Sequence, residues 1–318
     1  MIPLEDIRSA QETLAGTAIR TPLVRLHAGD GAEIYLKLEN LQPIGSFKIR
    51  GAYNAARRAA PEEVAAGLVT ASAGNMAQGV AWAARELGVP CTVIAPDHAP
   101  ETKVAAIERL GGRVIKVPFD EWWDAMENYG YEGVNGLFLH PVENEDVMAG
   151  NGTIGLEILE DLPDPDAVLI PWGGGGLTVG IASAIKAQRP GVKIYAVEQE
   201  TAAPLNATLE AGSPQEIEYQ HSFIDGAGAR ALLPKMWALG KPLLDGAYRV
   251  SLDETAAAIR MLAERTRVIA EGAGALAPAA ALSGRAGDGK LVCVVSGGNI
   301  DFSTLSVILA GETPGSNA

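Results

Sequence analysis

Residues 167–186 read AVLIPWGGGGLTVGIASAIK, in which four consecutive glycines join a short apolar run to a helical pattern. The run Ala167–Pro171 is continuously apolar, as expected of a strand that is covered on both faces. Gly173–Gly176 leave backbone N–H groups unhindered at the start of a helix, where an anion such as a phosphate can bind. The turn lacks the lysine of a P-loop and the GxGxxG spacing of the dinucleotide fingerprint. It therefore predicts a phosphate-binding turn of another kind, with a merely flexible turn as the alternative.

The same order of strand and helix recurs along the chain. Predicted strands are Ile34–Glu39, Leu68–Ala71, Cys91–Ala95, Arg113–Val117, Ala167–Pro171, Lys193–Val197 and Lys290–Ser296. Predicted helices are Gly74–Leu87, Glu101–Leu110, Asn151–Leu159, Leu177–Lys186 and Leu252–Arg265. Strands that alternate with helices indicate an α/β fold, with mostly parallel, twisted sheets covered by helices on both faces. Ligands bind at the carboxyl ends of such strands, so the strand-to-helix junctions are the candidate sites.

The composition limits the classes of function. The 318 residues are 47% apolar and 20% charged, which fits a globular chain of about two domains of ~150 residues each. The net charge of −14 disfavours binding to nucleic acid, and no apolar run approaches the ~20 residues of a membrane span. The N-terminus shows no signal-peptide pattern, and Cys91 and Cys293 lie in apolar runs typical of buried, unreactive thiols. We therefore expect a cytoplasmic protein that binds a small molecule.

A second junction, residues 45–52, reads GSFKIRGA and contains Lys48. Gly45 allows a strained backbone, Ser46 is a candidate N-cap, and Lys48 then lies in the first helical turn. The positive end of the helix dipole and the nearby Arg50 should lower the pKa of Lys48. A lysine with a lowered pKa is suited to Schiff-base chemistry. From this motif alone, a lysine that simply points into solvent is the stronger alternative.

Two further junctions carry polar side chains. Residues 72–79, SAGNMAQG, follow the strand LVTA and offer backbone N–H groups and the amide of Asn75 to an anion. Helix capping by Ser72 and Asn75 is an equally weighted alternative. Residues 296–299, SGGN, follow the strand KLVCVV and place a hydroxyl at its carboxyl end. Here the alternative is that Asn299 caps the helix that begins near Asp301.

Taken together and in their order along the chain, the four junctions resemble the β-family, or fold type II, of pyridoxal-phosphate enzymes. That order is 45–52, 72–79, 173–176 and 296–299. The resemblance is closest to the threonine/serine dehydratases, with serine racemase as a sister group, and extends from about Thr21 to Ser306. Further matching stretches are LKLENLQ at 36–42, GNGTIG at 150–155, AVE at 196–198 and Asp225-Gly226. The resemblance implies a homodimer of two-domain chains. Residues 67–144 would form a small domain that closes over the substrate, and residues 1–66 plus 145–318 would form the large domain that binds the cofactor.

The resemblance also implies a role for each matching residue. Lys48 would be the catalytic residue and would carry pyridoxal phosphate on its amine. Phe47 would lie beside the cofactor ring, with Gly226 leaving room on the other face. The ring oxygen would accept a hydrogen bond from Asn75, and the pyridine nitrogen would meet Ser296. The phosphate would be held by Gly173, Gly174, Gly175, Gly176 and the N–H group of Leu177. The amino-acid substrate would be bound by Ser72, Ala73, Gly74, Asn75 and Glu271.

The implied reaction eliminates water from a 3-hydroxy amino acid such as L-threonine or L-serine, and hydrolysis of the product then yields a 2-oxo acid and ammonia. A hydroxyl at Ser296 would not keep the pyridine nitrogen protonated, which favours prompt loss of a β-leaving group. Lys48 would take the α-proton as general base. Ala73 stands where a racemase would need a serine on the second face, which favours a dehydratase. No metal site is expected, because Pro204 stands where an acidic ligand would be needed.

Several alternatives stay open from the sequence. Serine racemase and a β-replacing enzyme such as a cysteine synthase would use the same cofactor. A dehydratase of 3-hydroxyaspartate or phenylserine would differ only in the pocket for the side chain, which no motif defines. The non-enzymatic alternative is a cofactor-binding or nucleotide-sensing protein of similar fold.

Overall fold

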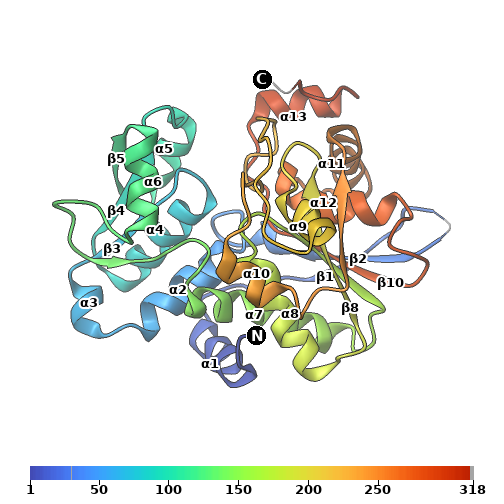
Figure 1. Cartoon of the computed structure of the whole chain (residues 1–318), viewed down its shortest axis with the longest axis horizontal. Coiled ribbons are helices and arrows are strands. Elements are labelled where there is room, and N and C mark those ends of the chain that lie inside the picture. Colours follow the sequence, from blue (N-terminus) through green and yellow to red (C-terminus); the bar gives the residue numbers. More distant parts are fainter. Residues whose placement is uncertain (30, 316–318) are drawn as a thin grey trace.

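The computed structural model describes residues 1–29 and 31–315, whose strands form two separate sheets (Figure 1). The larger sheet has the order β1-β2-β10-β7-β8-β9, in which the β1–β2 pair is antiparallel and the other pairs are parallel. Its strands are β1 (Leu23–Leu26), β2 (Glu33–Leu38), β10 (Lys290–Val295), β7 (Ala167–Pro171), β8 (Lys193–Gln199) and β9 (Gly246–Val250). The smaller sheet, in the order β5-β4-β3-β6, is parallel throughout. Its strands are β5 (Arg113–Val117), β4 (Cys91–Pro96), β3 (Leu68–Ala71) and β6 (Leu137–Phe138).

The helices divide between the two sheets. Those of the smaller lobe, at the left of Figure 1, are α3 (Pro61–Ala65), α4 (Asn75–Leu87), α5 (Glu101–Arg109) and α6 (Phe119–Glu127). Those of the larger lobe are α1 (Leu4–Leu14), α8 (Gly176–Gln188), α9 (Pro204–Ala211), α10 (Pro234–Gly240), α11 (Leu252–Thr266), α12 (Gly272–Leu282) and α13 (Phe302–Leu309). Helix α2 (Lys48–Arg58) packs against both α4 and α7 (Glu145–Asp161), so it links the two lobes. The short 3₁₀ helix η1 (Glu39–Leu41) follows β2.

The predicted α/β class is confirmed, and each predicted strand agrees with the structure to within two residues at either end. The helix predicted from Asn151 begins six residues earlier, at Glu145, because the side chain of Asn144 accepts a hydrogen bond from the Val147 N–H at 2.9 Å and caps it. Helix α12 was not predicted, because its sequence, GAGALAPAAAL, contains two glycines and a proline. It is helical because nearly the whole segment is buried against the larger sheet, where packing outweighs propensity.

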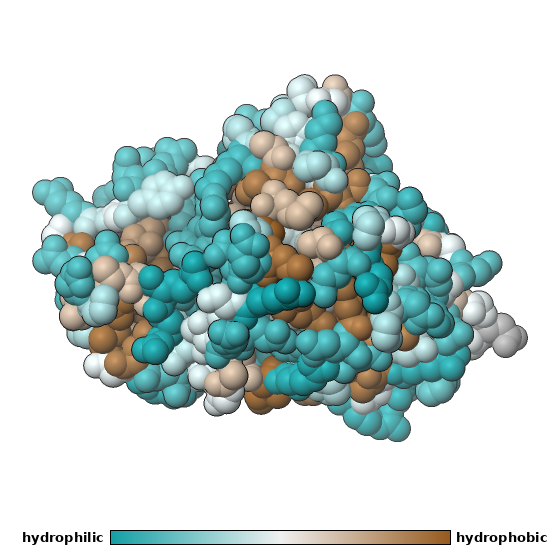
Figure 2. Space-filling model, turned by 90° about the horizontal axis from the view of Figure 1, so that it is seen from below, coloured by the Kyte–Doolittle hydropathy of each residue, from teal (hydrophilic) through white to brown (hydrophobic). Residues whose placement is uncertain are grey.

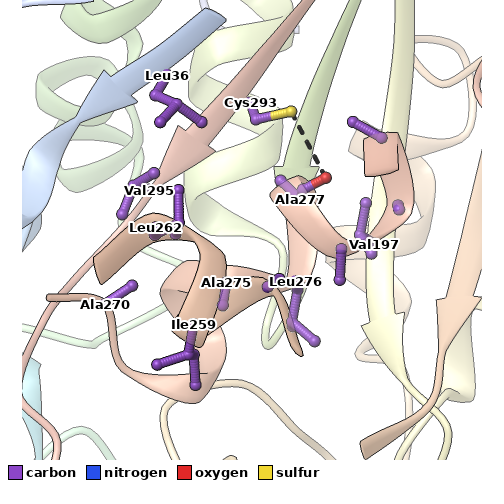
Figure 3. Close-up of a cluster of buried hydrophobic side chains, with 14 of the residues drawn as sticks. Leu36, Val197, Ile259, Leu262, Ala270, Ala275, Leu276, Ala277, Cys293 and Val295 are labelled. Atoms are coloured by element: carbon purple, nitrogen blue, oxygen red, sulfur yellow. Dashed lines mark hydrogen bonds between the residues drawn. The ribbon is translucent and has the colours of Figure 1, made fainter. Parts of the chain in front are cut away.

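Strand β10 and helix α12 lie at the centre of the larger core (Figure 3). The thiol of Cys293 lies 3.5 Å from the carbonyl oxygen of Ala277, and Leu36 and Val295 belong to the same buried cluster. Burial raises the pKa of the Cys293 thiol, and it raises that of Cys91 to about 12. Both thiols are therefore unreactive at neutral pH, as the sequence predicts.

A buried cluster of two cations and two carboxylates anchors α2 to the larger lobe. Arg50 bonds Glu39 at 2.8 Å and Glu157 at 2.7 Å, and the Nζ of Lys37 lies 2.6 Å from Glu157. All four side chains are at least 90% buried. Although burial opposes its ionisation, Arg50 beside it holds the pKa of Glu39 below its usual value. The cluster is neutral as a whole, and it orients the helix that begins at Lys48.

The outer surface is mixed. Figure 2 shows hydrophilic side chains over much of one face, with apolar patches between them. Among the described residues, the large apolar side chain with the greatest exposed fraction is Phe302 at the start of α13, at 86%. Within residues 1–29 and 31–315, no helix has both the length and the apolar content that a membrane span requires. In the same part of the chain, no three His, Cys, Asp or Glu side chains are grouped to hold a metal ion.

Candidate active site

The segment before α2 is bound to the end of β10. The N–H group of Phe47 donates to the carbonyl oxygen of Ser296 at 3.1 Å, and Ser46 pairs with Gly297 in an isolated antiparallel bridge. Phe47 is the N-cap residue of α2, so the prediction that Ser46 caps this helix is wrong. Among the described residues, the buried hydroxyl of Ser46 has no hydrogen-bond partner. These contacts bring Lys48 and Ser296 to the same edge of the larger sheet.

Lys48 is the first residue of α2, as predicted, and its amine lies among protein atoms. Its Nζ lies 3.4 Å from the carbonyl oxygen of Pro141 and 5.1 Å from the centre of the Phe47 ring. Burial lowers the pKa of Lys48 to about 8, and the carboxyl group of Glu271 acts in the opposite direction. The direction agrees with the prediction, but burial is the main cause and Arg50 is not one, because Arg50 is paired within the buried cluster. At neutral pH a useful fraction of this amine is deprotonated and can act as nucleophile or base.

Asn75 lies at the centre of a chain of side-chain hydrogen bonds. Its Nδ2 donates to Glu271 Oε1 at 2.7 Å, and its Oδ1 accepts from Asn299 Nδ2 at 2.7 Å. Neither asparagine caps a helix, since the N-cap of α4 is Gly74 and the second donor bond of Asn299 goes to a backbone carbonyl. The Ser72 hydroxyl accepts from the N–H of Gly74 at 3.2 Å, which orders the turn that precedes α4. The capping alternatives for Asn75 and Asn299 are therefore excluded, and their side chains face each other.

Glu271 is a buried carboxyl group between the two lobes, with 5% of its surface exposed. Burial, together with the charge of Asp225, raises the pKa of Glu271 to about 8, so it is largely protonated at neutral pH. A Cβ atom placed on Gly226 would lie 3.3 Å from its Oε1, and one placed on Gly297 would lie 2.3 Å from it. Only glycine at 297 leaves room for this carboxyl group. Asp225 itself forms an ion pair with Lys103 of helix α5 in the smaller lobe.

The four-glycine turn begins helix α8, with Gly175 as N-cap in the left-handed region at φ +94°. A Cβ atom on Gly174 would lie 2.4 Å from Cγ2 of Val142, and one on Gly175 would lie 2.6 Å from the Trp172 ring. Side chains are thus excluded on this side, while the first-turn N–H groups have no partner within the helix. The first turn contains no acidic residue, and it contributes Leu177, which is buried. The turn therefore fits a bound anion.

The predicted residues come together in two groups, which adjoin at Gly297, where a Cβ atom would lie 2.3 Å from Glu271 Oε1. One group holds Lys48, Phe47 and Ser296, and the other holds Asn75 and Glu271. The glycine turn adjoins the Gly226 loop, because a Cβ atom on Gly173 would lie 3.3 Å from the Cα of Ala227. The methyl group of Ala73 packs away from these groups, against a cluster in the smaller lobe.

Two functional positions were not identified from the sequence. His140 precedes Pro141, and its Nδ1 accepts hydrogen bonds from the two N–H groups that follow that proline. Gln199, at the end of β8, donates through Nε2 to the carbonyl oxygens of Ile224 and Ala227 and so holds the Gly226 loop. The position of Gln199 at the carboxyl end of a strand was an available signal. His140 follows β6, whose two residues are too few to give a strand pattern.

The donor set fits one kind of ligand. A half-buried amine with a lowered pKa suits an aldehyde, and a glycine turn at a helix start suits a phosphate. The segment that contains Pro141 and Val142 touches both the Lys48 amine and the glycine turn, and so connects them. Pyridoxal phosphate carries both groups on one ring, and its phosphate and aldehyde match these donors.

Comparisons with known proteins agree with this chemistry. The family model described as "Pyridoxal-phosphate dependent enzyme" matches residues 14–297. An L-threonine ammonia-lyase of Thermotoga maritima is 44% identical over 315 residues, which cover 97% of this chain and 78% of that protein. The solved structure of maize serine racemase is 32% identical, with a TM-score of 0.89 and 97% of both chains covered. That of processed threonine deaminase isoform 2 from Solanum lycopersicum is 35% identical, with a TM-score of 0.88, covering 97% of this chain and 92% of that chain. By the extent of these matches, the chain belongs to the family of pyridoxal-phosphate dependent enzymes.

Proposed function

We propose that this chain is an ammonia-lyase that eliminates water from L-threonine or L-serine, after which hydrolysis of the product yields a 2-oxo acid and ammonia. The observation that carries the proposal is the amine of Lys48, which starts α2 and whose pKa is lowered by burial to about 8. The proposal is supported by relatives named L-threonine ammonia-lyase and L-threonine dehydratase, which are 36–44% identical over 97% of the chain.

The proposed cofactor site assigns each group a task. Lys48 would bind the aldehyde carbon, Phe47 would flank the ring, and Ser296 would meet its nitrogen. Asn75 would donate to the ring oxygen through the second hydrogen of its Nδ2, since the first is donated to Glu271 and its Oδ1 already accepts from Asn299. Gly226 would leave room on the remaining face. The phosphate would be bound by the N–H groups of Gly173, Gly174, Gly175, Gly176 and Leu177.

Bound pyridoxal phosphate supplies an electron sink for the charge that develops at the α-carbon. The chain would supply the proton transfer: the Lys48 amine would remove the α-proton and return a proton to the departing β-hydroxyl, which would leave as water. The released enamine then takes up water and yields a 2-oxo acid and ammonia. We further propose that Ser72, Ala73, Gly74 and Asn75 form the substrate-binding turn, because Ser72 orders it and it precedes α4. Glu271, which is protonated at neutral pH, adjoins this turn without adding a negative charge.

Serine racemase is the second candidate, because the maize enzyme of that name has a TM-score of 0.89 to this chain. A racemase needs an acid–base group on each face of the α-carbon. Ala73 has no such group and packs into an apolar cluster, which supports elimination over racemisation. Chiral analysis of serine after incubation separates the two, since a dehydratase consumes L-serine without forming D-serine.

We propose the same division into domains as the resemblance implies. Residues 67–144 would form the small domain and residues 1–66 plus 145–318 the large one, a division supported by the two separate sheets.

We also propose a homodimer, for which exposed Phe302 and Leu309 of α13 offer apolar surface. A cytoplasmic location is supported by two buried, unpaired cysteines. Sedimentation of the purified holoenzyme tests the dimer.

The test of the function is a screen of 3-hydroxy amino acids for release of 2-oxo acid. L-Threonine, L-serine, 3-hydroxyaspartate and phenylserine are each incubated with enzyme that carries its cofactor. The proposal requires turnover of threonine or serine. Turnover of 3-hydroxyaspartate or phenylserine alone would replace the proposed substrate, and no turnover of any of the four would contradict the reaction.

A further inference from the structure

The segment between β6 and α7 touches two parts of the proposed cofactor site. We name residues 140–143, which read HPVE, the His140 turn. Lys48 Nζ lies 3.4 Å from the carbonyl oxygen of Pro141. The side chain of Val142 occupies the space beside Gly174, where a Cβ atom would lie 2.4 Å from its Cγ2. The His140 turn is thus in contact with both the catalytic amine and the four-glycine turn.

The imidazole of His140 holds this turn in shape. Its Nδ1 accepts a hydrogen bond from the N–H of Val142 at 3.1 Å and from that of Glu143 at 2.9 Å. A ring nitrogen that accepts carries no proton, so the proton of the neutral ring lies on Nε2. Only 5% of the His140 surface is exposed, so water is poorly placed to replace either bond. The turn therefore requires the neutral ring in this tautomer.

Four groups surround the imidazole, and burial together with the two lysines among them favours the neutral ring. They come from four elements: Glu143 in the turn itself, Lys48 of α2, Lys235 of α10, and Tyr129, whose ring lies 4.9 Å from the imidazole ring. Burial lowers the pKa of His140, and the two lysines add to this effect while Glu143 opposes it. The carbonyl of Glu143 also accepts from Lys235 Nζ at 3.0 Å, and its carboxylate accepts from the Tyr129 hydroxyl at 2.8 Å.

We propose that His140 is a positioning residue for the cofactor. By accepting two backbone hydrogen bonds, it fixes the His140 turn. The fixed turn holds Pro141 against the Lys48 amine and Val142 against the four-glycine turn, so that these two parts of the cofactor site keep their relative positions. Removing the acceptor leaves two poorly solvated N–H groups without a partner, and the turn must rearrange to satisfy them. The inference rests on the cofactor site proposed above, but it does not depend on which amino acid is the substrate.

The covalent geometry of the side chains offers matched variants. In asparagine, Oδ1 is separated from Cβ by two bonds, as is Nδ1 in histidine, and asparagine commonly accepts a hydrogen bond from the N–H two residues ahead. His140→Asn therefore retains the acceptor. His140→Leu fills similar space without an acceptor, and His140→Gln places its oxygen one bond too far. His27 is exposed, so His27→Leu controls for the loss of an imidazole elsewhere.

The experiment measures how fast each holoenzyme loses its cofactor. Wild type and variants are dialysed against cofactor-free buffer, and the visible absorbance of the bound cofactor is followed with the thermal unfolding midpoint. His140→Leu should release cofactor about tenfold faster than wild type or more. His140→Asn and His27→Leu should stay within about threefold of wild type. If His140→Leu does not fold, His140→Gln takes its place in the comparison with His140→Asn.

Two results would overturn the inference. One is a His140→Leu or His140→Gln holoenzyme that retains cofactor as wild type does. The other is a folded His140→Asn protein that releases cofactor as fast as His140→Leu, since a general packing role would explain that. Turnover of L-threonine by wild type is measured separately. A wild-type protein that binds cofactor but turns over no hydroxy amino acid contradicts the proposed function and leaves the positioning role to be decided by release rates alone.

Discussion

Asn75 Nδ2 donates a 2.7 Å hydrogen bond to Glu271 Oε1, and this bond connects the two lobes. Asn75 begins α4, which packs on the smaller sheet, and Glu271 precedes α12, which packs on the larger one. The Oδ1 of Asn75 accepts a hydrogen bond from Asn299, so hydrogen bonds at both Nδ2 and Oδ1 fix the orientation of the amide. The substrate-binding turn proposed for the smaller lobe is thereby held against the proposed cofactor site of the larger lobe.

The ion pair of Lys103 with Asp225 is a second link between the lobes, beside Gly226. We predict that Lys103→Met raises the KM for the amino acid severalfold, because closure of a lobe over substrate loses one of its contacts. The pair is partly exposed, so the free energy of unfolding should change by less than about 1 kcal/mol. Lys116→Met is the control, since Lys116 pairs with Glu101 within the smaller lobe. Equal KM values for the two variants would refute a role in closure.

Gly174→Ala tests the four-glycine turn. The added methyl group would meet Val142 Cγ2 at 2.4 Å, and overpacking of this kind costs about 1–3 kcal/mol. Affinity for pyridoxal phosphate should fall roughly tenfold, as measured by spectroscopic titration. Gly191→Ala, where the added atom meets nothing within 4 Å, should bind cofactor as wild type does. Unchanged affinity in Gly174→Ala would exclude the turn from the cofactor site.

Arg50→Leu tests the buried ion cluster. It leaves Glu39 and Glu157 buried without their main cation, and breaking a buried pair costs about 3–5 kcal/mol. Urea unfolding should show that loss. Arg58→Leu, in the same helix, removes a partly exposed cation and should cost less than about 1 kcal/mol. Equal losses of unfolding free energy in the two variants would mean that the buried cluster stabilises the fold no more than the partly exposed pairs of Arg58 do.

The lowered pKa of Lys48, about 8, predicts a pH dependence for cofactor capture. Below this value the amine is protonated and cannot attack an aldehyde, so the rate of capture by cofactor-free protein should rise with pH through about 8. Above it the rate should level off. An exposed lysine, with its pKa near 10.4, would show no plateau until higher pH. A rate that still rises steeply above pH 9.5 would contradict burial of this amine.

Much of the fold was predictable because local pattern and burial agree. Strands β3, β4, β7 and β10 are short apolar runs that are buried along nearly their whole length, and glycine-rich junctions mark the ends of β7 and β10. The start of α7 was missed, because Gly150, just before the predicted start, is a poor helix former, and the helix continues through Gly152 and Gly155. Those glycines are required for close packing: a Cβ atom on Gly150 would lie 2.4 Å from the backbone oxygen of Arg50.

The site was predictable only in part, for a related physical reason. Sequence spacing identified Lys48, but it assigned the lowering of its pKa to the helix dipole and to Arg50 rather than to burial, and Arg50 bonds Glu39 and Glu157. Partners so distant in sequence leave no local pattern. His140 was likewise missed, because its role depends on which backbone groups face its ring.

The most direct test compares release of 2-oxo acid from L-threonine by wild type and by Lys48→Ala, each supplied with pyridoxal phosphate. The account predicts 2-oxobutanoate and ammonia in equal amounts from wild type, and none above background from a folded Lys48→Ala protein. Release by Lys48→Ala at the wild-type rate, or no release by wild type that carries its cofactor, would contradict it.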